Sequence, residues 1–79
     1  MLRFSYDKTY DVLYILFSDD DNTYGDEDDQ GIVLHRNFNT DDITGVTIFD
    51  FEKKYRTNQL PVLSLPIELD YNEMTAMLL

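Results

Sequence analysis

Cysteine is absent from the 79-residue sequence, and histidine occurs once. Without cysteine there are no disulfides and no thiolate metal sites, and a small secreted scaffold is disfavoured. A lone histidine without cysteine does not make an ordinary zinc site. We therefore expect no metal and no cofactor.

Long apolar runs are missing too. The longest, Val12 to Phe17, falls far short of the ~20 residues that span a bilayer. The N-terminus also lacks the charged region, apolar stretch and small-residue cleavage site of a secretory signal. We expect a cytoplasmic protein, of bacterial type, that does not enter a membrane.

Basic residues are scarce: six lysines and arginines stand against sixteen acidic residues, giving a net charge of −10. This charge repels phosphate backbones and anionic membrane surfaces, so direct binding to nucleic acid or membrane is disfavoured. It attracts a basic protein partner over long range. Solubility alone is the simpler explanation of the same charge.

Hydrophobic residues make up 43% of the chain, enough for one folded domain over residues 1–79. Alternating or continuous apolar patterns predict strands at residues 2–7, 12–17, 32–36 and 43–51. Phe4 and Tyr6 point inward in this pattern, and Gly45 indicates a bulge or a close backbone contact. Residues 18–30 contain seven acids and predict a loop or a frayed hairpin end outside the core.

The C-terminal third, residues 58–79, differs from the sheet region at 2–52. Pro61 and Pro66 predict extended chain or an edge strand. Asp70 is a candidate cap for a helix over residues 71–79, with Met74, Met77 and Leu78 on one face. The predicted fold class is α+β, mainly β: an antiparallel four- to five-stranded meander with a short C-terminal helix.

Three stretches resemble the small bacterial domain family of unknown function DUF2283. They are Tyr6–Ser18, with its Tyr-Asp opening, its Asp before an apolar-Tyr-Ile run and its closing Ser, then Gly31–Leu34 and Ile43–Asp50. The resemblance covers roughly residues 4–54. The acidic residues 19–30 and the tail beyond Arg56 depart from the family pattern. The resemblance implies a fold and little chemistry, with an antitoxin-like role suggested by family members encoded beside small toxins.

The acidic segment is the main candidate for protein interaction. Its candidate residues are Asp19, Asp20, Asp21, Tyr24, Asp26, Glu27, Asp28 and Asp29. Clustered carboxylates also suit calcium, but a calcium-binding loop counted from Asp20 places Gly31 where a bidentate Glu is needed. A solvated run of charge is the better-supported interpretation.

Asp7, Asp11, Asp50 and His35 form a second candidate set, a polar cluster. Paired carboxylates perform acid–base chemistry if the fold brings them together. The alternative is that Asp7 and Asp11 bond turn amides and that His35 is a hydrogen-bonded side chain on a strand face.

The basic residues Lys53, Lys54 and Arg56 follow Phe51 closely. They suit a small anion, the acidic loop of another molecule, or simply the solvated end of a strand. Tyr10, Tyr24 and Tyr55 are candidate interface tyrosines.

These features support a non-enzymatic protein-binding module, either antitoxin-like or an inhibitor of a basic partner. A small carboxylate-based enzyme, or a domain that binds a metal or another ligand, is the alternative. Self-association into a homo-oligomer is compatible with the first hypothesis, because apolar residues on both faces of two strands need cover.

Overall fold

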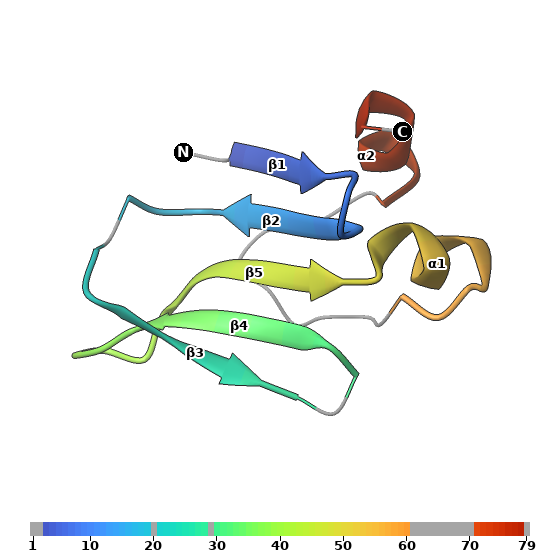
Figure 1. Cartoon of the computed structure of the whole chain (residues 1–79). Helices are drawn as coiled ribbons and strands as arrows, with labels where there is room; N and C mark the ends of the chain where they lie inside the picture. Colours follow the sequence, from blue (N-terminus) through green and yellow to red (C-terminus); the bar gives the residue numbers. More distant parts are fainter. Residues whose placement is uncertain (1–2, 20, 29, 61–70, 79) are drawn as a thin grey trace.

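A computed structural model describes residues 3–19, 21–28, 30–60 and 71–78. Within these ranges the chain forms a five-stranded antiparallel sheet and two short helices (Figure 1). The elements are β1 (Arg3–Asp7), β2 (Val12–Leu16), β3 (Thr23–Glu27), β4 (Ile32–Asn37), β5 (Ile43–Phe49), α1 (Phe51–Arg56) and α2 (Tyr71–Leu78). The predicted α+β, mainly β class is confirmed.

The strands follow the order β1-β2-β5-β4-β3, so the predicted meander order is wrong. Tight connections join β1 to β2, β3 to β4 and β4 to β5, whereas the chain from β2 to β3 leads to the opposite edge of the sheet (Figure 1). β5, the strand richest in buried residues, therefore lies at the centre between β2 and β4. The acidic β3 forms one edge.

One face of the sheet carries the hydrophobic core. Leu13 of β2 pairs with Ile48 of β5, which pairs with Ile32 of β4, so their side chains share a face. All core members are at most 1% exposed: Leu13, Ile15, Ile32, Val46, Ile48 and Phe51. Phe4 and Tyr6 pack against this cluster, which confirms their inward orientation.

The last predicted strand, residues 43–51, is two residues longer than the observed one. β5 ends at Phe49, and Asp50 adopts left-handed backbone angles (φ 54°, ψ 45°) that turn the chain into α1. Phe51 consequently begins a helix instead of continuing the strand, and its fully buried ring covers the core face. The basic residues after Phe51 lie on this helix, not on a strand end.

Gly45 lies beside a bulge, as predicted. Gly45 pairs with His35 and Ile43 pairs with Arg36, so Thr44 is an extra residue in β5. A Cβ atom on Gly45 would lie 2.7 Å from the carbonyl oxygen of Ile15. Only glycine permits this approach of β2 to β5.

The acidic segment contains a strand that the sequence did not reveal clearly. β3 pairs along its whole length with β4, from Thr23 opposite Asn37 to Glu27 opposite Val33. All five residues of β3 are exposed. The segment therefore stays outside the core, as predicted, but it extends the sheet instead of forming a simple loop.

α2 confirms the predicted C-terminal helix. Asp70 and both prolines lie outside the described residues, and so do the side chains of Met74 and Leu78; Met77 is 71% exposed. A hydrogen bond of 2.9 Å from the Tyr55 hydroxyl to Asn72 Oδ1 joins α1 to α2. Neither helix in the described ranges has the length and apolar character to cross a membrane.

Candidate functional site

Asp11 binds the beginning of α1 from the turn between β1 and β2. Its Oδ1 accepts the backbone N–H of Glu52 at 2.7 Å, and its Oδ2 accepts that of Lys53 at 3.3 Å. Its carbonyl oxygen accepts the N–H of Phe51 at 3.0 Å. Free N–H groups at a helix start need acceptors, and Asp50, the residue directly before α1, makes no side-chain hydrogen bond to them. Asp11 supplies these acceptors.

Tyr6 completes this arrangement. Its hydroxyl donates to Asp11 Oδ1 at 2.6 Å. Burial and the neighbouring Asp11 carboxylate raise the pKa of Tyr6. Burial opposes ionisation of Asp11, but hydrogen bonds from Tyr6 and the two amides, with the charge of Lys54, hold the pKa of Asp11 below its usual value. Asp11 is therefore an ionised structural acceptor.

The four members of the predicted polar cluster do not form one site. The Asp7 carboxylate accepts the N–H groups of Thr9 and Tyr10, at 2.9 and 3.2 Å, which is the turn arrangement. Asp50 is exposed beside α1. His35 pairs with Gly45, four residues along β5 from Phe49, so it lies ~13 Å from the Asp11 end of the sheet.

His35 lies on the sheet face opposite the core. Its Nε2 is 2.8 Å from Thr47 Oγ1, and burial lowers its pKa. The imidazole thus forms a hydrogen bond with a threonine on the neighbouring strand β5. This agrees with the alternative in which His35 is a hydrogen-bonded side chain on a strand face and has no catalytic role.

The acidic edge brings together most of the predicted interaction residues. Asp26 and Glu27 belong to β3 itself, and Asp21 and Asp28 lie shortly before and directly after it. Asp19 lies apart from them, because it forms an ion pair with Arg3 of β1, at the opposite edge of the sheet, with 2.9 Å between Arg3 Nη2 and Asp19 Oδ1. All five are exposed. Asp20 and Asp29 lie outside the described residues. Asp28 also has a structural role, because its Oδ1 accepts the N–H groups of Gln30 and Ile32.

The position of β3 is fixed at one end by contacts of Tyr24. Its hydroxyl donates to Asp41 Oδ1 at 2.6 Å, and its ring contacts Phe38 edge-on, with centroids 6.2 Å apart. The hydrogen bond to Asp41 is the main cause of the raised pKa of Tyr24. Arg36 reaches Asp26 at 3.6 Å and the carbonyl of Asp41 at 3.1 Å. The edge is thus held in register by side chains as well as by backbone pairing.

The sheet face opposite the core exposes apolar side chains. The register places Tyr14, Leu16 and Phe49 on this face, and they are 42%, 42% and 40% exposed. The sequence prediction of apolar residues on both faces of β2 and β5 is confirmed. α1 packs through Phe51 on the core face.

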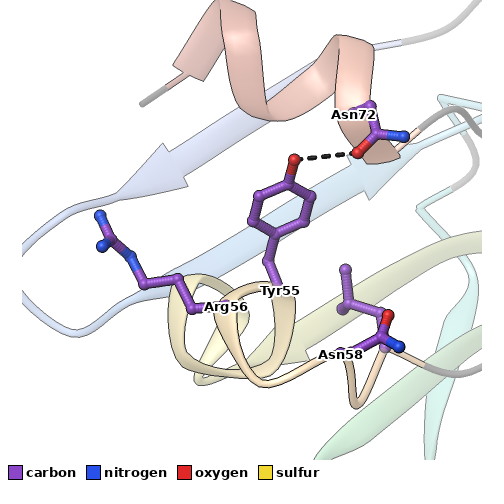
Figure 2. Close-up of a pocket in the computed structure, with 5 residues that line it drawn as sticks. Tyr55, Arg56, Asn58 and Asn72 are labelled. Atoms are coloured by element: carbon purple, nitrogen blue, oxygen red, sulfur yellow. Dashed lines mark hydrogen bonds between the residues drawn. The ribbon is translucent and has the colours of Figure 1, made fainter.

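A shallow cleft of about 480 Å³ lies between the two helices, lined by Tyr55, Arg56, Asn58, Leu60 and Asn72. Figure 2 shows Tyr55 reaching from α1 to Asn72 while Arg56 points away from this hydrogen bond. Arg56 is paired with Glu52 at 2.6 Å, and Lys54 donates to the Phe49 carbonyl. Two of the three clustered cations thus have local partners within the chain.

No group of three or more His, Asp or Glu side chains in the described ranges is arranged to hold a metal ion. The calcium-loop prediction includes Asp20, which falls outside those ranges.

Comparison with known proteins gave no match: no family model, curated protein or solved structure resembles the chain significantly. The resemblance to DUF2283 therefore stays a prediction.

Proposed function

We propose that this protein is a non-enzymatic module that binds a basic protein partner through the acidic edge of its sheet. The observation that carries the proposal is β3, an edge strand whose five residues are all exposed and which bears Asp26 and Glu27. Unpaired sheet edges are common sites of protein association. The net charge of −10 gives this edge a preference for basic partners.

The charge acts mainly on the rate of encounter. Exposed carboxylates at Asp21, Asp26 and Glu27 attract a basic surface over distances up to about 10 Å at moderate salt. Ion pairs formed at such exposed positions contribute little affinity individually. Additional binding energy has to come from backbone pairing or from apolar contacts close to the edge.

Capture of partners from an extract of the source cells tests this proposal. We expect the immobilised protein to retain basic proteins at low salt and to release them as salt is raised. The variant Asp26→Asn/Glu27→Gln should lose them. Asp50→Asn/Glu73→Gln removes the same charge from exposed residues at the helical end and should retain them. Equal capture by both variants, or capture of acidic proteins alone, contradicts the proposal.

Self-association is a second candidate function, favoured by the exposed Tyr14, Leu16 and Phe49 on the face opposite the core. Light scattering at several concentrations measures it directly. A dimer that dissociates in Leu16→Ser or Phe49→Ser supports a homo-oligomer built on this face. A monomer at all concentrations contradicts it.

In the part of the chain that the structure describes, no arrangement of side chains favours the enzymatic alternative, because Asp11 is committed to α1 and His35 lies at a distance along the sheet. An antitoxin-like role and an inhibitor of a nucleic-acid-binding enzyme are the concrete forms of the proposed function. Identification of a captured partner distinguishes them. Cytoplasmic localisation stays a prediction from the sequence.

A further inference from the structure

The outer side of β3 presents backbone groups that no described strand pairs with. The hydrogen bonds from Asp28 N to Ile32 O and from Phe38 N to Asn22 O fix the phase of the β3–β4 ladder. In an antiparallel ladder, alternate residues direct their N–H and C=O groups to the partner strand. Even-numbered positions of β3 therefore face β4. The groups of Thr23, Gly25 and Glu27 face outward.

Within the described residues, this edge lacks several of the devices that protect edge strands from strand addition. Natural edge strands are protected by charged side chains, above all lysine, and by proline, a bulge or a covering segment. β3 contains neither lysine nor proline, and its pairing with β4 shows no register shift. Its protection is acidic: Asp26 and Glu27 on the strand, with Asp21 before it and Asp28 after it.

Acidic protection is selective. A second copy of the chain brings the same acids and a net charge of −10 to the edge, so pairing of β3 with itself is opposed. A strand carrying lysine or arginine meets no such repulsion. Neighbouring residues of a strand point to opposite faces, so the consecutive Asp26 and Glu27 attract a basic side chain on each face.

Gly25 adds a feature to the edge. It has no side chain, and a Cβ placed there would lie 3.0 Å from the Val33 Cγ1 atom of β4. The Val33 methyl group therefore borders the space that a side chain at position 25 would fill. A guest residue opposite Gly25 gains apolar contact if its side chain is aliphatic.

We propose that β3 accepts an extended basic segment of another protein as a sixth strand of the sheet. The guest carries two consecutive basic residues opposite Asp26 and Glu27, followed by an aliphatic residue opposite Gly25. This inference rests on the proposed function and names the structure and chemistry of the partner segment. Backbone hydrogen bonds to Thr23, Gly25 and Glu27 supply affinity, and the side-chain pattern supplies specificity.

The test uses an extended peptide slightly longer than the five residues of β3, in which two lysines precede each valine. Its counterpart has glutamate in place of lysine. Amide hydrogen exchange is followed by NMR on the full chain. We expect the lysine peptide to slow exchange at Thr23, Gly25 and Glu27 and the glutamate peptide to have no effect.

Two matched substitutions separate backbone pairing from charge. Gly25→Pro removes an outward N–H that the β3–β4 ladder does not use, and Gly25→Ala adds the Cβ while keeping the N–H. We expect Gly25→Pro to weaken binding at least about tenfold and Gly25→Ala about twofold at most. If Gly25→Pro fails to fold, peptides with N-methyl groups on alternate residues, in both phases, make the same comparison with the unaltered protein. One phase should lose binding.

Equal binding by Gly25→Pro and Gly25→Ala, or by both N-methylated peptides, overturns strand addition. So does binding whose exchange effects are confined to Tyr14, Leu16 and Phe49, or failure of the lysine peptide to bind. In each of these cases, charge-dependent capture of basic proteins still supports the proposed function. If the capture of basic proteins also proves independent of charge at the β3 edge, both the strand-addition proposal and the proposed function are contradicted.

Discussion

The Asp11 carboxylate accepts the backbone N–H of Glu52 at 2.7 Å, across 41 residues of sequence. This bond closes the turn between β1 and β2 onto the start of α1 and thereby fixes Phe51 over the core. α1 covers the core face of the sheet, and its start therefore depends on a hydrogen-bond acceptor from the N-terminal part of the chain.

Asp11→Asn should lower the free energy of unfolding by about 1–2 kcal/mol, because the amide loses the charge and turns an NH2 donor toward one of the two backbone N–H groups that the carboxylate accepts. Asp50→Asn is the matched control, since both aspartates have positive φ (55° and 54°), which asparagine tolerates. Asp50 makes no capping hydrogen bond, so its change should stay within about 0.5 kcal/mol. Urea unfolding measures both. Equal losses would mean that the Asp11 bonds contribute nothing net.

Low pH should remove the contribution that the ionised Asp11 carboxylate makes to the free energy of unfolding. Its pKa is lower in the folded than in the unfolded chain, so ionisation stabilises the fold above about pH 4, and the gain is lost as pH falls through the folded-state pKa. We expect unfolding free energy to fall more steeply between about pH 5 and 2 in the wild type than in Asp11→Asn. Parallel pH profiles for the two proteins would refute this assignment.

High pH should lower the free energy of unfolding through ionisation of Tyr6. Its pKa is raised in the fold, so the unfolded chain loses the proton first, and stability decreases as pH rises above about 10. Tyr6→Phe should flatten this decrease. Tyr10→Phe, at a residue that is 74% exposed, should leave it in place. Denaturant unfolding from pH 8 to 11 measures the effect, and an unchanged slope in Tyr6→Phe contradicts it.

Gly45→Ala should cost about 1–3 kcal/mol, the range for forced overpacking, because its Cβ meets the backbone oxygen of Ile15 at 2.7 Å. Gly25→Ala meets only the Val33 side chain, at 3.0 Å on an exposed edge, and should cost less than about 1 kcal/mol. Thermal unfolding of the two variants gives the comparison. A Gly45→Ala protein as stable as Gly25→Ala would show that β2 and β5 separate easily.

The sequence predicted the elements that bury apolar side chains. Val12–Leu16 and Ile43–Phe49 are rich in β-formers, and their burial follows from composition alone. α1 was missed because Phe51 continues the alternation of β5, while the left-handed Asp50 and the capping Asp11 leave no local signal. β3 was missed because Thr23–Glu27 pairs through its backbone and buries nothing. The sequence does not predict the strand order, because β2 pairs with β5, a strand far along the chain, and local sequence patterns carry no information on such pairing.

The sequence predicts which residues belong to the candidate site but not how the fold arranges them. The exposed acids of residues 19–28 were identified correctly as a surface segment, since crowded carboxylates stay hydrated. The place of Asp21, Asp26, Glu27 and Asp28 beside an open sheet edge depends on the strand order. Asp7 and Asp11 were assigned to turns by residue type, but the reach of Asp11 to α1 required the folded structure.

Association kinetics with a captured basic partner test the central claim most directly. The account predicts that Asp26→Asn/Glu27→Gln slows association several-fold at low salt and flattens its salt dependence, whereas Asp50→Asn/Glu73→Gln leaves both close to the wild type. Equal association rates for the two variants at low salt would contradict binding through the acidic edge of β3.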